Sequence, residues 1–255
     1  MRAGPNDRLP AAAGLEVIVP MGAINIQGSR VIDLSQTIEP GIPVPPGFAG
    51  PEFHVVLSQA RGGVANVELL RIGAHTATHC DAPYHFFSQL CAVDGLAPDC
   101  LIGPAVVVDL TAKQGSVAIE ADDLRAWELA TGEAIRPHDI VLLHTGHARN
   151  WTIGEAGAAY WQNGWPYLTR TAAEYLAAKP IRAIGVESFD PDWVDPGDLS
   201  TAEFPSHRTL LPRGILIMEN LTNLDRIPAP RCQVIALPLK LKGCSGSPLR
   251  VVAVV

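Results

Sequence analysis

Residues 75–85 read HTATHCDAPYH, a concentration of polar side chains that core packing alone would not select. The stretch holds three of the eight histidines of the chain and one aspartate, and it follows an apolar run that ends at Ile72. Neutral imidazoles and a carboxylate are ligands that suit zinc or manganese. The stretch therefore predicts a metal site in which His75, His79 and Asp81 hold the ion.

These three ligands can meet only if the backbone bends between them. On a helix the two histidines would share a face but the aspartate would point elsewhere, and Pro83 disfavours helical backbone at the residue before it. In a straight strand the two histidines would lie about 13 Å apart, at roughly 3.3 Å per residue. We therefore expect a turn over 76–78 followed by extended backbone over 79–81, with Cys80 facing away from the ion.

The composition is that of a folded protein with no affinity expected for nucleic acid or membranes. Of the 255 residues, 47% are hydrophobic and 18% are charged, which is enough apolar material for a full core. No run approaches the roughly 18 apolar residues of a membrane-spanning helix, and the N-terminal segment lacks the apolar stretch of a signal peptide. The net charge of −7 without a basic cluster argues against a nucleic-acid partner. We expect a cytoplasmic protein without membrane association.

Short runs rich in Val, Ile and Leu recur along the chain and predict strands. These runs cover residues 31–34, 53–57, 64–72, 105–110, 140–144, 181–186, 215–218, 234–239 and 249–255. Helical features mark 121–131, 170–179 and 206–211. Many strands with few helices indicate an α/β fold with a mixed sheet. We expect residues 29–255 to form a single domain and residues 1–28 to be an N-terminal extension.

Two further groups of residues are candidates for the site. Apolar runs end in Asp33, Asp109, Glu187 and Glu219, and ligands of α/β sheets gather beyond the carboxyl ends of strands. For the first three acids we favour a structural role in capping the next turn. Five aromatic residues could line a pocket, although each is at least as plausible in the core. They are Phe48, Tyr84, Phe86, Phe87 and Trp193.

The stretch 75–85 resembles the H-x-G-T-H-x-D-x-P-x-H signature of the metal-dependent cyclase family, which includes bacterial kynurenine formamidases and isatin hydrolases. The similarity continues in order through much of the chain, from about residue 31 to 255. The segments that carry it are 33–35, 143–146, 184–190, 207–211, 219–224, 238–243 and 246–250. The resemblance implies the swivelling β/β/α fold of that family and a homodimer or homotetramer.

The resemblance also implies roles for individual residues. The three ligands named above would hold one ion, His207 and Glu219 would complete a second site, and Asp81 would be able to bridge the two. His85 would be the acid/base residue. One or two ions of zinc or manganese are therefore expected. The presence of Glu219 favours the formamidase-like arrangement over that of the isatin hydrolases.

Two positions depart from the family pattern. Ala77 stands where the family has Gly, and alanine adopts positive φ less readily than glycine, so we expect a differently shaped turn and an altered first site. Glu187 stands where Asp is usual, and its side chain is one methylene longer. We expect this extra reach to reshape the pocket.

The ligand set predicts a hydrolase of a small amide C–N bond, and the resemblance implies an aryl formamide similar to N-formylkynurenine as substrate. In the expected mechanism, metal-bound hydroxide attacks the carbonyl and His85 relays a proton to the leaving nitrogen. A cyclic amide such as isatin, or an ester, is the alternative substrate. Two other possibilities stay open, a cyclisation or dehydration with the same ligands and a non-catalytic metal-binding homologue.

Overall fold

The computed structural model describes residues 30–45, 47–195 and 202–255. The predicted extension, residues 1–28, lies outside the described residues, so the division of the chain into extension and domain stays a prediction. Within the described residues, no helix is both long and apolar enough to cross a membrane.

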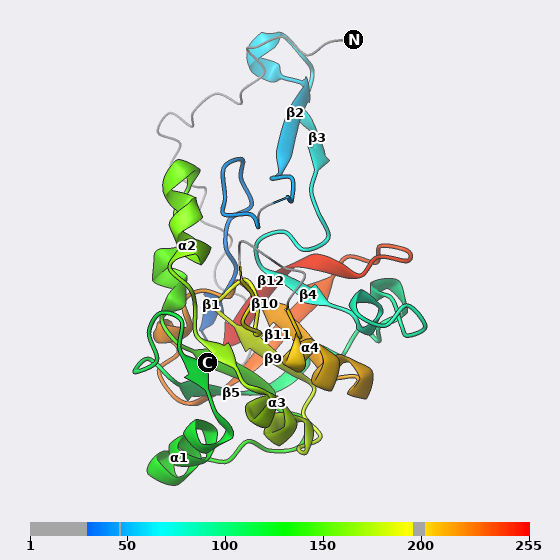
Figure 1. Ribbon diagram of the computed structural model, residues 1–255. Helices are drawn as coiled ribbons and strands as arrows, with labels where there is room; N and C mark the ends of the chain where they lie inside the picture. Colours follow the sequence, from blue (N-terminus) through cyan, green and yellow to red (C-terminus); the bar gives the residue numbers. More distant parts are fainter. Residues whose placement is uncertain (1–29, 46, 196–201) are drawn as a thin grey trace.

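A mixed sheet, eight-stranded in the described part of the chain, forms the centre of the molecule (Figure 1). Its strands are, in order across the sheet, β1 (Val31–Asp33), β12 (Gly246–Val254), β11 (Arg231–Pro238), β5 (Ile102–Asp109), β7 (Ile140–His144), β9 (Ala183–Val186), β10 (Leu216–Glu219) and β4 (His79–Asp81). Strand β4 also pairs with β12, so the sheet closes on itself into a barrel-like arrangement. Strands β5, β7, β9 and β10 run parallel, and the other pairs are antiparallel.

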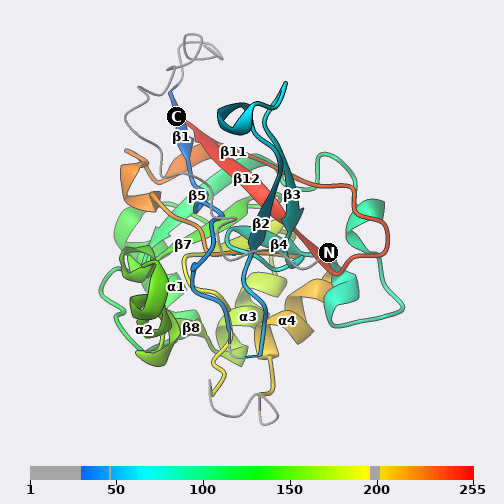
Figure 2. The ribbon, with the colours of Figure 1, turned by 90° about the horizontal axis from the view of Figure 1, so that it is seen from above.

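The smaller elements surround this sheet. The α-helices are α1 (Ala121–Thr131), α2 (Ala159–Gln162), α3 (Arg170–Ala177) and α4 (Pro205–Leu210). Short 3-10 helices are η1 (Gln59–Arg61), η2 (Pro83–His85), η3 (Val93–Gly95), η4 (His147–Asn150), η5 (Gly154–Ala158), η7 (Leu211–Arg213) and η8 (Leu224–Arg226). Two strand pairs stand apart, β2 (Glu52–Leu57) with β3 (Val67–Arg71) and β6 (Ala118–Ile119) with β8 (Tyr167–Leu168). Figure 1 shows the β2–β3 hairpin extending away from the rest of the molecule, and in Figure 2, seen from above, the hairpin lies in front of the central sheet.

Both faces of the parallel strands are buried, which explains their unbroken apolar runs. In β7, Val141 and Leu143 pack in one cluster with Leu124 of α1 and with residues of α3 and α4. Ile140 and Leu142 alternate with them and pack in a second cluster with residues of β11 and β12. The helices therefore cover one face of these strands.

The predicted α/β fold with a mixed sheet is confirmed. Each predicted strand run overlaps a strand, and each predicted helical segment overlaps a helix. The ends differ by up to three residues, and β12 is the clearest case because it begins at Gly246 instead of Leu249. Residues 246–248 read Gly-Ser-Pro, which weakens a strand, but β4 supplies a partner for them. The bend expected over 76–78 and the extended segment over 79–81 are both present.

Candidate metal centre

The turn before β4 is built around Ala77. Its φ of 51° lies in the left-handed region, at a cost of roughly 1–2 kcal/mol for an L-residue. Its carbonyl oxygen accepts hydrogen bonds from Nδ1 of His79 at 2.8 Å and from Nδ2 of Asn220 at 2.9 Å. Ala77 thus takes a conformation that glycine adopts more easily, and the side chains of the first site still meet. The expected effect of this alanine on the first site stays a prediction.

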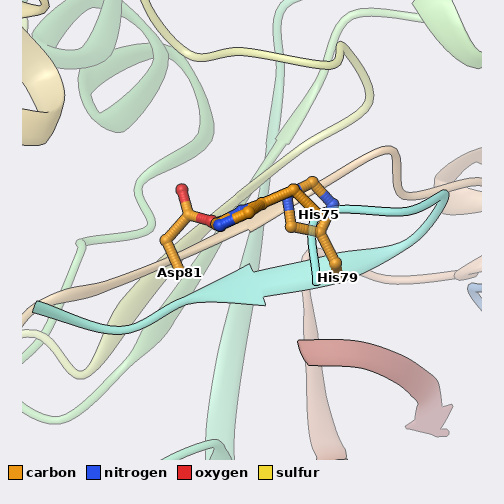
Figure 3. Close-up of side chains that lie close together, drawn as sticks. All are labelled: His75, His79 and Asp81. Atoms are coloured by element: carbon orange, nitrogen blue, oxygen red, sulfur yellow. The ribbon is translucent and has the colours of Figure 1, made fainter. Parts of the chain in front are cut away.

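The three ligands predicted for the first ion converge beside β4 (Figure 3). Oδ1 of Asp81 lies 2.7 Å from Nδ1 of His75 and 3.5 Å from Nε2 of His79. His79 and Asp81 are buried, and His75 is partly buried. Cys80 points to the other side of the strand and packs in the hydrophobic core, as predicted. The sequence therefore predicted correctly which side chains of this stretch meet.

His207 and Glu219 lie on the other side of Asp81. Nε2 of His207, from α4, is 3.2 Å from Oδ2 of Asp81 and 3.6 Å from Oε1 of Glu219. Oε2 of Glu219, at the end of β10, is 3.3 Å from Nε2 of His79. The two oxygens of Asp81 therefore face different histidines, which is the geometry that a bridging carboxylate needs.

The three histidines that face Asp81 are His75, His79 and His207. In each of them the ring nitrogen that faces away from Asp81 makes a hydrogen bond. Nε2 of His75 lies 2.8 Å from Oγ of Ser245, and Nδ1 of His207 lies 2.7 Å from a carboxylate oxygen of Asp192. His79 uses the carbonyl of the preceding turn, as described above. Such contacts fix the orientation of metal-binding imidazoles and leave the second nitrogen to face the ion.

Two buried atoms of the cluster make no well-aligned hydrogen bond, although potential partners lie close to both. They are Nε2 of His79 and Oδ1 of Asp81. An unpaired buried polar atom is costly, and one that faces other potential ligands indicates a missing ion. The ligand atoms of His75, His79 and Asp81 lie within 4.8 Å of one another, as do those of a second group made by Asp190, His207 and Glu219. The donor set fits one or two divalent cations.

The electrostatics agree with a site for positive charge. Burial, together with the nearby charge of Asp81, raises the pKa of Glu219. Burial alone would also raise the pKa of Asp81, but the hydrogen bond with His207 and the close imidazoles of His75 and His79 hold it well below its ordinary value. Burial likewise raises the pKa of Asp190 well above its ordinary value. A divalent cation would offset the repulsion among these carboxylates.

His85, in η2, faces the same cluster. Its ring centroid lies 4.1 Å from that of His75 and 5.8 Å from that of His207. Burial lowers the pKa of His85 to about 4, so the imidazole is neutral at pH 7. The structure therefore brings together all the residues for which the sequence predicted a role in metal binding or acid/base chemistry.

A cavity of about 210 Å³ opens over the cluster. Five aromatic rings line it, from Phe48, Phe86, Trp161, Phe189 and Phe204. Two of these, Phe48 and Phe86, were among the aromatic candidates from the sequence. The other three candidates do not line the cavity. Tyr84 and Trp193 are 37% and 41% exposed, and Phe87 packs against the core cluster of the helices.

The residues Asp190, Asp192 and Ser245 belong to the site but had no assigned role in the sequence analysis. The first two follow β9 in the run Phe-Asp-Pro-Asp. Two acids close behind a buried strand are the sequence feature that could have indicated a role in the site. Asp192 also accepts hydrogen bonds from the backbone N–H groups of Ser206 and His207, at 2.6 and 3.2 Å. No feature of the sequence indicated a role for Ser245, because this residue comes close to His75 only when β12 pairs with β4 and closes the barrel.

Glu187 does not line this cavity, so the expectation that it reshapes the pocket is wrong. Its carboxylate accepts hydrogen bonds from the backbone N–H groups of Thr145 and Gly146, and lies 3.4 Å from Nδ1 of His144. Its extra length reaches the loop after β7. The two other acids with an expected structural role also have one, since Asp33 forms an ion pair with Arg250 and Asp109 accepts hydrogen bonds from its neighbour at position 111.

Comparisons with known proteins agree with this architecture. The model of the Cyclase family, described as "Putative cyclase", matches residues 32–193. The kynurenine formamidase of Geobacillus thermodenitrificans is 33% identical over 221 residues, which is 86% of this chain and 94% of the relative. That of Bacillus cereus is 32% identical over 224 residues, or 88% of this chain and 97% of the relative. Isatin hydrolase A from Ralstonia solanacearum superimposes with a TM-score of 0.79 at 30% identity, covering 96% of this chain and all of the other. The chain belongs to the Cyclase family.

Proposed function

We propose that the protein is a metal-dependent hydrolase that cleaves the C–N bond of a small, non-peptide amide. The proposed metal ligands are His75, His79, Asp81, His207 and Glu219. Similarity to the kynurenine formamidases supports this proposal. A second support is a solved relative described as a potential metal-dependent hydrolase with cyclase activity, which is 26% identical and superimposes with a TM-score of 0.69.

One observation carries the proposal more than any other. Nε2 of His79 and Oδ1 of Asp81 are buried without a well-aligned hydrogen bond at the point where the other proposed ligands converge. A bound zinc or manganese ion would polarise a carbonyl group and lower the pKa of a water molecule. A hydrogen-bonded structural cluster would not leave these two atoms unpaired.

The side chains of the chain itself account for the remaining requirements. His85 faces both the cluster and the cavity, so a ring nitrogen of its neutral imidazole can accept a proton and return it to the leaving nitrogen. The aromatic walls can hold an aryl group and exclude water from the reacting bond. We therefore propose an aryl formamide as the substrate class.

A second substrate class is an isatin-type lactam or an ester. The similarity to a solved isatin hydrolase bound to the product analogue thioisatinate supports it, with a TM-score of 0.79 and 28% identity over 91% of this chain. The reacting group would be the same carbonyl, so the same side chains would serve.

The test is metal analysis combined with a substrate panel. The protein is purified without added metal, its bound ions are identified and counted, and turnover of aryl formamides, isatin-type lactams and aryl esters is measured. We expect one or two zinc or manganese ions per chain and hydrolysis of an aryl formamide. Protein that holds the metal but hydrolyses none of the compounds would instead be a non-catalytic homologue.

We further propose that the protein is a cytoplasmic homodimer or homotetramer that acts on a small molecule. The family resemblance supports the oligomer. Light scattering coupled to size-exclusion chromatography measures the molar mass in solution, and the mass of a single chain, 27.1 kDa, would contradict the proposal.

A further inference from the structure

The cavity over the proposed metal ligands has a single polar end. Its polar lining comes from four of the proposed ligands, all except Asp81, and from their neighbours His85, Asp190 and Asn220. The other described lining residues have apolar or aromatic side chains, and they include the five aromatic residues named above. A bound molecule can therefore place polar groups at the cluster and meets only apolar walls elsewhere.

The described lining of the cavity contains no lysine or arginine. Among the described residues, Arg208 is the basic residue that contacts the lining. Its guanidinium carbon lies 5.7 Å from the ring centroid of Phe86. Its side chain is exposed, and its Nε donates a hydrogen bond to the carbonyl of Glu203.

The size of the cavity also limits the substrate. A cavity of about 150 Å³ accommodates benzene. The 210 Å³ available here therefore has room for one aromatic ring and a small reacting group. A longer side chain on the ring would have to lie along the apolar walls or leave the cavity.

From these observations we infer that the pocket selects aryl amides whose ring carries no anionic substituent. This inference rests on the proposed function and narrows its substrate class. A carboxylate on a longer substituent would lose its hydration against the aromatic walls and find no cation to replace it. The amino-acid end of an N-formylkynurenine-type molecule is such a substituent, so a neutral aryl formamide is expected to be the better substrate.

The experiment uses two formamides that have the same shape and differ in charge. One is 3-(2-formamidobenzoyl)propanoate, and the other is its primary amide. We expect kcat/KM of the metal-loaded protein to be at least about 100-fold higher for the amide, because an apolar pocket discriminates about that strongly even against one added hydroxyl. The ratio kcat/KM is the correct measure because it is unaffected if the carboxylate binds the metal in a non-productive orientation.

The outcomes separate the inference from the proposed function. If both compounds are hydrolysed with kcat/KM values within a few-fold of each other, the inference is wrong and the proposed function stands. If neither is hydrolysed, the same comparison is made with isatin-5-carboxylate and its primary amide. Failure of all four compounds would contradict the proposed function itself.

A gain-of-function variant tests the cause of the selection. Phe48 lies at the rim of the cavity and is 61% exposed, so Phe48→Arg can place a cation beside the substituent. We expect this variant to shift the ratio of the two kcat/KM values toward the carboxylate by up to about fivefold, as for a partly exposed ion pair. Val64→Arg, which adds the same charge at a position 91% exposed on the β2–β3 hairpin, is the matched control and should leave the ratio unchanged. Equal shifts in both variants would contradict a local effect.

If the carboxylate compound is a good substrate, Arg208→Ala identifies the reason. A large loss of activity toward that compound alone would show that Arg208 reaches the cavity and binds the carboxylate. That result would overturn the inference.

Discussion

The carboxylate of Asp192 lies 2.7 Å from Nδ1 of His207 and accepts the backbone N–H groups at the start of α4 as well. Asp192 is completely buried, and the opposite nitrogen of the imidazole faces Asp81. This single side chain therefore fixes both the position of the short helix and the ring orientation of a proposed metal ligand. Its contribution should be visible in metal affinity.

Asp192→Asn is expected to weaken zinc binding by about 10- to 100-fold, the usual effect of removing a hydrogen-bond partner behind a metal ligand. The amide keeps the size of the side chain but loses its charge. Competition with a chromophoric chelator measures the dissociation constant. Asp122→Asn, at a position 91% exposed in α1, is the control. Equal affinities in the two variants would show that Asp192 does not position the ligand.

His85→Ala is expected to lower kcat by about 10² to 10⁴ while the metal content stays that of the unchanged protein, because the variant removes only the proposed proton carrier. Elemental analysis and steady-state kinetics on the same preparation provide both measurements. His54→Ala, in the exposed β2–β3 hairpin, is the control. Full activity of the His85 variant would contradict its assigned role, and loss of metal would make His85 a ligand instead.

Ala77→Gly and Ala126→Gly remove the same methyl group from two different backbone conformations. At Ala77 the relief of roughly 1–2 kcal/mol of left-handed strain outweighs the roughly 0.5–1 kcal/mol of added unfolded-state entropy. We expect a change in the free energy of unfolding between zero and about 1.5 kcal/mol of stabilisation. Ala126 is an exposed residue inside α1, where the same change should cost about 1 kcal/mol. Chemical denaturation measures both, and equal destabilisation would contradict the strain at Ala77.

His147 predicts a dependence of stability on pH that does not involve the metal centre. Burial lowers its pKa from 6.5 to about 4 in the folded protein. Between these values the unfolded chain binds more protons than the folded chain, so stability falls as the pH is lowered through this range. His147→Gln should reduce the slope of unfolding free energy against pH by about 1.4 kcal/mol per pH unit. Denaturation at a series of pH values tests this, and an unchanged slope would contradict it.

Local signals in the sequence were sufficient to predict most of the strands, the main helices and which side chains near β4 come together. The apolar run 140–144 became β7 with the predicted ends, because a strand buried on both faces leaves a continuous hydrophobic pattern. The turn before His79 could be predicted because neither a helix nor a straight strand would bring the three neighbouring polar side chains together. Their spacing in the sequence is enough to show this.

Contacts between distant segments could not be predicted from local patterns in the sequence. Ser245 is 170 positions from His75, and Glu187 turned away from the cavity because backbone N–H groups at 145–146 were available to it. Nothing in the local pattern around either residue specifies the partner. The role of Asp192 has the same origin, since its carboxylate acts on a helix that begins 13 residues later.

The pairing of β4 with β12 has a consequence for how the protein is made. Translation delivers His79 and Asp81 long before their strand partners at 246–248 and the hydroxyl of Ser245. A nascent chain that has not yet reached residue 245 therefore lacks one strand partner of β4 and the hydroxyl that holds His75, so it cannot complete the proposed metal site. A chain ended before Ser245 should bind zinc far more weakly than the full-length protein, even though every proposed ligand is present in it.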